Sequence, residues 1–172
     1  METKKKKFVL DEKDIVQNGL LAAVYVALTY VLAPISFQAI QFRVSEILVL
    51  SCFFNKKKTI GLTLGCLISN LVSPLGLMDI GFGTLATLLA CIGIMFSKHL
   101  IVAIFFPVIS NGIIVGLELY IIGEPLWFSM GMVALGELAV MIVGYIIIML
   151  IRKGKRFFRL SGTTLLHSMT GH

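Results

Sequence analysis

The sequence predicts an all-α, polytopic membrane protein with six transmembrane helices, from its composition, its apolar runs and the placement of its basic residues. The 172 residues are 58% apolar and only 14% charged, with a mean hydropathy of +0.97. An average soluble domain is roughly 45–50% apolar and about 25% charged, so a soluble fold of this size would leave much apolar surface facing water. At about 20 residues per spanning helix, the chain is long enough for six helices with short loops.

Six apolar runs predict the helices, at residues 15–33, 44–54, 59–72, 79–96, 100–122 and 128–151. Turn signals separate several of them, and Asp79 stands at a cap-like position before the fourth run. The second and third runs are shorter than a usual span, and such lengths also suit re-entrant or interfacial segments. Residues 1–14 form a basic N-terminal segment, 15–151 the six-helix transmembrane domain, and 152–172 a basic C-terminal tail.

The basic residues test the number of spans independently. All Lys and Arg residues except Arg43 lie in four groups, at 4–13, 56–58, 98 and 152–159. Six spans place all four groups on one side, which the positive-inside rule identifies as the cytoplasm, with both termini there. A nucleic-acid surface would instead interleave basic and aromatic residues on one folded face, so no nucleic-acid partner is expected.

Polar residues inside the apolar runs predict a functional site, because such residues are costly in a membrane. Under the six-span topology they fall in the outer half and are expected to form a pocket open to the exterior. The candidate ligand-binding residues are Gln41, Arg43, Glu46, Asn70, Asp79, Asn111, Glu118, Trp127 and Glu137.

Each candidate also has a purely structural interpretation. Arg43 and Glu46 are three residues apart and could neutralise each other on one helix face. Asp79 could serve only as a helix cap, and Trp127 could belong to the interfacial aromatic belt. Glu118 and Glu137 have no basic residue near them in sequence, so they are either protonated packing residues or carboxylates whose hydrogen-bond donors come from a ligand.

The polar set suits a small, planar, donor-rich molecule, either neutral or cationic, since carboxylates accept paired N–H groups and amines. The sequence contains no phosphate-binding loop, no nucleophile with a base partner and no metal-ligand spacing. We therefore expect neither catalysis nor a cofactor, and we expect another protein to supply the energy for transport.

Three segments of the chain resemble the QueT family, whose members are substrate-binding S components of energy-coupling factor (ECF) vitamin transporters assigned to queuosine precursors. The segments are Gln41–Phe42–Arg43–Val44–Ser45–Glu46, residues 65–70, and residues 73–90, which contain the pattern D-x-x-F-G-T-L-A-T. The resemblance covers the first four predicted helices through these motifs, and the last two through the placement of Glu118 and Glu137.

The resemblance implies a six-helix S-component bundle in the cell membrane that binds a 7-deazaguanine, namely preQ1, preQ0 or queuine. It implies a transmembrane coupling protein and two ATPase subunits as partners, with Ala23 and Ala27 on the docking face of the first helix. In this hypothesis Glu118 or Glu137 holds the guanine edge and the other faces the 7-substituent. Asn70, Asn111 or Gln41 completes the ring's hydrogen bonds, while Arg43 and Glu46 brace the loop after the first helix.

Two other functions stay open from the residues alone. One is an S component for a different vitamin, in which only the ligand changes. The other is a stand-alone carrier or membrane enzyme that uses Glu118 and Glu137 for proton chemistry.

Overall fold

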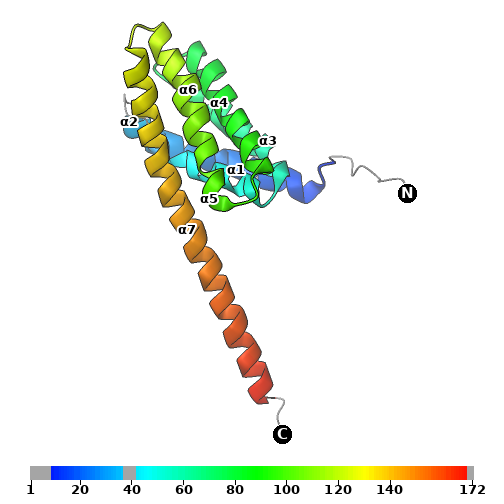
Figure 1. Ribbon diagram of the computed structural model, residues 1–172. Helices are drawn as coiled ribbons and strands as arrows, with labels where there is room; N and C mark the ends of the chain where they lie inside the picture. Colours follow the sequence, from blue (N-terminus) through cyan, green and yellow to red (C-terminus); the bar gives the residue numbers. More distant parts are fainter. Residues whose placement is uncertain (1–8, 37–41, 170–172) are drawn as a thin grey trace, which may run out of the picture.

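The computed structural model describes residues 9–36 and 42–169, and within these ranges the chain is helical without any strand (Figure 1). Side chains are described for all of these residues except 35 and 155–169. The elements, with η marking a 3₁₀ helix, are α1 (Glu12–Val31), α2 (Ala33–Ser36), η1 (Val44–Phe53), η2 (Lys56–Lys58), α3 (Thr59–Asn70), α4 (Leu77–Phe96), α5 (Leu100–Ala103), α6 (Phe105–Ile121) and α7 (Leu126–Met169). The predicted all-α class is confirmed.

Four helical segments are long and apolar enough to cross a membrane, namely α1, α4, the α5–α6 pair and α7 as far as Gly154. The ten residues of η1 and the twelve of α3 are too few. At 1.5 Å per residue α3 rises about 18 Å, against a hydrocarbon core of about 30 Å. The six predicted segments are thus present in order, but six complete spans are not confirmed.

The first helix begins earlier than predicted because of its N-terminal cap. We predicted a helix from residue 15, whereas α1 begins at Glu12 because Asp11 caps it. The Asp11 side chain accepts from the Asp14 backbone N–H, and the Asp14 side chain accepts from the Asp11 N–H in return. This capping box satisfies two backbone donors that a helix start otherwise leaves unpaired.

The fifth predicted helix is interrupted at Ile104, which separates α5 from α6. Pro107 accounts for the break, because proline has no N–H to donate to the carbonyl of Ala103, four residues earlier, and its ring crowds that carbonyl.

Two predicted boundaries were wrong. The fourth helix is capped at Gly76 and begins at Leu77, so Asp79 is its third residue and not its cap. Gly76 has φ +61°, a conformation that glycine adopts readily. The last helix was expected to end at Ile151, but α7 continues to Met169 and projects beyond the bundle (Figure 1). Residues 152–169 contain no proline to stop it.

Small residues let two pairs of helices approach closely. On α3, a Cβ added at Gly61 would lie 2.4 Å from the backbone oxygen of Asn18 in α1. On α6, a Cβ at Gly116 would lie 2.8 Å from Cα of Met130 in α7. These contacts pack α3 on α1 and α6 on α7, in the way small residues join helices in membranes.

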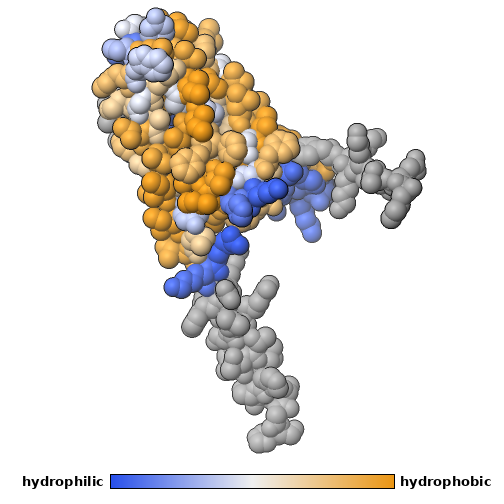
Figure 2. All heavy atoms as spheres, in the orientation of Figure 1, coloured by the Kyte–Doolittle hydropathy of each residue, from blue (hydrophilic) through white to orange (hydrophobic). Residues whose placement is uncertain are grey.

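Basic side chains gather at one end of the bundle, which we call the basic end. Lys57 pairs with Asp14 at the start of α1, and Lys56 lies over the ring of Phe96 at the end of α4. Figure 2 shows hydrophilic residues concentrated where α7 leaves the bundle, with apolar residues covering the surface above.

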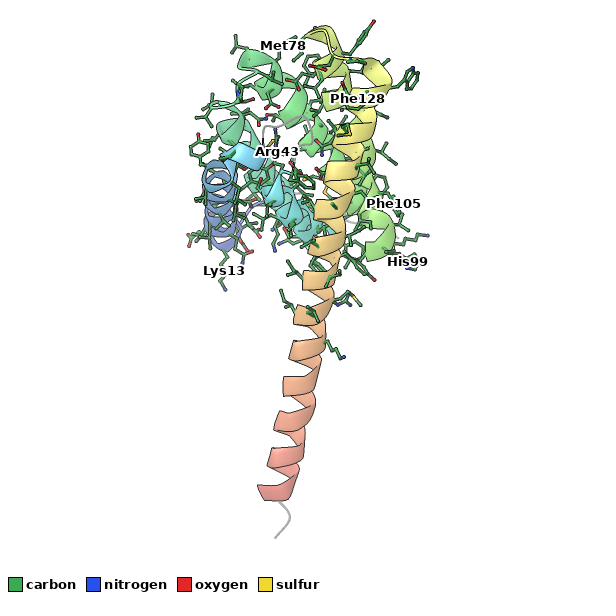
Figure 3. The ribbon with its side chains drawn as sticks, turned by 90° about the vertical axis from the view of Figure 1, so that its left-hand side faces the viewer. Lys13, Arg43, Met78, His99, Phe105 and Phe128 are labelled. Atoms are coloured by element: carbon green, nitrogen blue, oxygen red, sulfur yellow. The ribbon has the colours of Figure 1, made fainter. Side chains whose placement is uncertain are left out.

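The opposite end carries the starts of α4 and α7. In Figure 3, Met78 and Phe128 mark that end, while Lys13 and His99 mark the basic end. The larger apolar core contains Leu50, Leu62, Ile94 and Met141, among others. A smaller cluster contains Ala86, Val115 and Val133. Buried polar side chains from several helices are found alongside these apolar clusters.

Candidate ligand-binding site

Seven of the predicted site residues are buried, and we call these seven the polar cluster. Its members are Arg43, Glu46, Asn70, Asp79, Asn111, Glu118 and Glu137, and each is at most 4% exposed. They come from the start of η1, the end of α3, and from α4, α6 and α7. Figure 3 shows Arg43 in the interior, between α1 on one side and α4 and α7 on the other.

An ion pair between Arg43 and Asp79 joins η1 to α4. Nη2 of Arg43 lies 3.3 Å from Oδ2 and 3.4 Å from Oδ1 of Asp79. The neutralisation of Arg43 by Glu46, which their spacing suggested, is therefore not the main pairing, although the two groups do interact electrostatically. The partner that the fold supplies is 36 residues away in sequence.

Gly83 leaves the space that this ion pair occupies. A Cβ at Gly83 would lie 2.4 Å from Oδ1 of Asp79 and 2.8 Å from Nδ2 of Asn70. Real Cβ atoms do not approach other atoms so closely, so any larger residue here would displace one of the two polar side chains. Gly83 was not among the predicted site residues.

Asn70 is held in one orientation at the end of α3. Its Nδ2 donates to the backbone carbonyl of Asp79 at 2.8 Å. Within the described chain its Oδ1 is buried and has no hydrogen-bond partner. Asn70 therefore presents a fixed carbonyl acceptor within the polar cluster.

Glu46 is bound on one oxygen and open on the other. Its Oε1 accepts hydrogen bonds from the Tyr25 hydroxyl of α1 and, at 2.8 Å, from the Thr87 hydroxyl of α4. No described group bonds to its Oε2. A further contact of 2.7 Å between the hydroxyls of Thr29 and Ser45 also joins α1 to η1.

Sequence reasoning missed Tyr25 and Thr87, which hold Glu46. A single Tyr or Thr in a spanning segment is common and gives no signal by itself. Asp79, Gly83 and Thr87 are each four residues apart, which places all three on one face of α4. This spacing could have identified Gly83 and Thr87, but not Tyr25.

Glu118 and Glu137 approach the same group of charges from α6 and α7. Glu118 interacts electrostatically with Asp79 and Arg43, and Glu137 with Glu46 and Arg43. Among the described residues, neither carboxylate oxygen of Glu118 has a hydrogen-bond partner, and the same is true of Oε1 of Glu137. Both acids therefore interact with Arg43, and their placement in one ligand pocket stays a prediction.

Asn111 lies two helical turns before Glu118 on the same face of α6. It is buried, and its Nδ2 has no acceptor among the residues that the structure describes. The polar cluster therefore offers one unpaired amide donor as well as several unpaired acceptors.

Two predicted residues are not brought into the polar cluster. Trp127 lies in the first turn of α7 with 82% of its surface exposed, as expected for an interfacial aromatic residue. Gln41 lies outside the described residues.

The accessibility of the site differs from the prediction. We expected a pocket open to the exterior, but the seven side chains of the polar cluster are almost entirely buried. In the described part of the chain these side chains are therefore covered by the protein.

Ala23 and Ala27 lie on the exposed face of α1. Tyr25 and Thr29 are buried on the opposite face, where they contact η1. In the described part of the chain, the small-residue face of α1 is not covered by another helix.

Two comparisons with known proteins point to the same transporter family. The model of the QueT transporter family matches residues 15–153. The queuosine precursor transporter QueT of Lactococcus lactis subsp. cremoris (strain MG1363) is 38% identical over 148 residues, covering 76% of this chain and 87% of the relative. No solved structure matches the chain.

Proposed function

Because the chain belongs to the QueT transporter family, we propose that it is the substrate-binding S component of an ECF importer that captures a queuosine precursor. The ligand is a 7-deazaguanine: preQ1, preQ0 or queuine. The observation that supports this most is the set of buried, unpartnered polar atoms of Glu118, Glu137 and Asn111. Leaving such atoms unpaired costs free energy, which a donor-rich ligand would recover.

The hydrogen-bonding groups of a 7-deazaguanine complement these atoms. Its guanine edge carries N1–H and a 2-amino group, which together fit the two oxygens of one carboxylate. Glu118 or Glu137 takes this edge, and the other faces the 7-substituent. Asn111 donates to a ring acceptor, and Asn70 or Gln41 completes the hydrogen bonds of the ring.

The remaining members of the polar cluster hold the site together. Arg43 and Asp79 link η1 to α4, and Glu46 links both of these elements to α1 through Thr87 and Tyr25. Ligand binding close to these bonds would alter how α1 is held.

Transport requires partners in this proposal: a transmembrane coupling protein and two ATPase subunits. The basic end faces the cytoplasm by the positive-inside rule, with both termini on that side and the polar cluster in the outer half of the membrane. Ala23 and Ala27 on the exposed face of α1 are the proposed contacts with the coupling protein.

Equilibrium binding to the purified protein tests the ligand assignment. Glu118→Gln and Glu137→Gln are each expected to weaken 7-deazaguanine binding about tenfold or more, which corresponds to about 1.4 kcal/mol. Glu124→Gln removes an exposed carboxylate beside the start of α7 and should leave affinity unchanged. Failure of the parent protein to bind any of the three precursors would refute the proposal, and wild-type affinity in both variants would remove these acids from the site.

ATP-dependent uptake tests the docking surface. Replacing both Ala23 and Ala27 by Leu should spare ligand binding but abolish uptake in vesicles that contain the whole transporter. Val143→Leu, at an exposed position on α7, provides the control for added bulk. Uptake by the chain without ATPase subunits would instead support the stand-alone carrier.

A further inference from the structure

The polar cluster contains more acidic than basic groups. It holds four carboxyl groups, from Glu46, Asp79, Glu118 and Glu137. Arg43 is the one basic side chain among the buried residues that the structure describes. Among the described residues it pairs with Asp79, with 3.3 Å between Nη2 of Arg43 and Oδ2 of Asp79. One positive charge cannot balance four carboxylates.

Glu46 is stabilised in a different way from the other acids. The hydroxyls of Tyr25 and Thr87 donate to it, and these neutral donors supply hydrogen bonds without any charge. Glu118 lacks even these, since both of its oxygens are buried without a donor in the described chain. Glu137 has one such oxygen. The carboxyl oxygens without donors are therefore concentrated on the two acids of α6 and α7, together with Oε2 of Glu46.

Burying a carboxylate without a counter-charge is costly, and such a group either takes up a proton or acquires a cation. A neutral ligand would supply donors and leave the charge unbalanced. A ligand that carries an ammonium group would supply both donors and charge. We propose that Glu118 and Glu137 select the cationic form of the ligand, so that a 7-deazaguanine with an aminomethyl substituent is preferred to a neutral one.

This inference rests on the proposed function. Asn111 places a second requirement on the ligand. Asn111 and Glu118 are seven residues apart, or about 10 Å along the helix axis. The unpaired Nδ2 of Asn111 needs an acceptor, so the ligand is not a simple cation. A bicyclic ring with a carbonyl and an aminomethyl group carries both an acceptor and a charged donor. A primary alkyl amine has a pKa near 10, as in lysine, so it is positively charged at pH 7.

Three ligands that differ only at position 7 test the proposal. They carry aminomethyl, hydroxymethyl or nitrile groups, and the hydroxymethyl compound matches the size of the aminomethyl compound without its charge. We expect the purified full-length protein at pH 7 to bind the aminomethyl compound about tenfold or more tightly than either neutral compound. The ratio should fall to about twofold in Glu118→Gln or Glu137→Gln, which identifies the acid that faces the ammonium group.

The outcomes separate this inference from the proposed function. Equal affinity for the aminomethyl and hydroxymethyl compounds in the parent protein would overturn charge selection and leave 7-deazaguanine binding intact. A preference that persists undiminished in both variants would also overturn it, because the charge would then be recognised elsewhere. Absence of binding by all three compounds would refute the proposed function itself, and the inference with it.

Discussion

The basic end and the polar cluster both contain buried polar side chains, but they differ in how many of the buried polar atoms have hydrogen-bond partners. At the basic end, Asn18 donates from Nδ2 to the backbone oxygen of Asp14 at 2.8 Å and accepts from the Gly61 N–H at 2.7 Å. Asp14 also pairs with Lys57. In the polar cluster, by contrast, Glu118 has no described partner for either oxygen.

This difference distinguishes polar groups that join helices from polar groups that we propose bind a ligand. Buried polar atoms in native proteins are nearly always hydrogen-bonded, so each exception needs an explanation. The contacts of Asn18 fasten α1 to α3 and leave nothing for a ligand. The acids of α6 and α7 are buried with carboxyl oxygens that have no described partner, and this cost is consistent with a role in binding.

The largest expected effect comes from breaking the satisfied part of the polar cluster. Asp79→Asn preserves the shape of the side chain but removes the carboxylate that pairs with Arg43. Breaking a buried ion pair by removing one partner costs about 3–5 kcal/mol. Unfolding of the purified protein in mixed micelles should show a loss of stability of this size. If Asp79→Asn unfolds like the parent protein, the ion pair does not stabilise the fold.

A smaller effect is expected from filling the space beside that pair. Gly83→Ala places a Cβ against Asp79 and Asn70, and overpacking of this kind costs about 1–3 kcal/mol. Gly81→Ala, on the same helix with nothing within 4 Å, is the matched control. It should be neutral or stabilising by up to about 1 kcal/mol, because alanine favours helix over glycine. Equal stability of the two variants, measured by the same unfolding assay, would show that Gly83 is not confined as described.

The smallest effect is expected at the basic end. The hydrogen bond to the Asp14 carboxylate raises the pKa of Lys57 above its ordinary value of 10.5. A raised pKa in the folded state means that the pair stabilises the fold fully below pH 10.5 and loses this effect as pH rises through the higher value. Because the Lys57 side chain is partly exposed, solvent screens the pair and its contribution is small.

Stability measured against pH checks this prediction. Lys57→Gln should be less stable than the parent protein at pH 8, and the difference should shrink above pH 10.5. Lys13→Gln, at an exposed position of α1, should show no such dependence. A difference that stays constant up to pH 12 would contradict the proposed titration of Lys57.

The sequence was sufficient to predict the helical class and the order of the helices, because the apolar runs and the turn signals mark them. It also led us to predict that acids from distant segments lie close together, since the four basic groups fix which ends of the helices lie on one side. Glu118 and Glu137 are both buried, and both interact electrostatically with Arg43. That they line one ligand pocket stays a prediction.

The partners within the polar cluster could not be predicted in the same way. Arg43 is close to Glu46 in sequence, but its carboxylate partner is Asp79, which only the packing of η1 on α4 brings near. The 3₁₀ geometry of η1 also has no clear signature in a short apolar run. Tyr25 and Thr87 are ordinary residues for a membrane helix, and only the folded structure shows that both donate hydrogen bonds to Glu46.

The unbroken length of α7 has a mechanical consequence. Its 44 residues carry Glu137 inside the bundle and the basic residues from Arg152 onward outside it, within one continuous helix. Residue 159 lies about 33 Å along the axis from Glu137 at 1.5 Å per residue. A tilt of about 10° around Glu137 would therefore sweep that point through about 6 Å, so a small movement near the acids is amplified at the membrane surface.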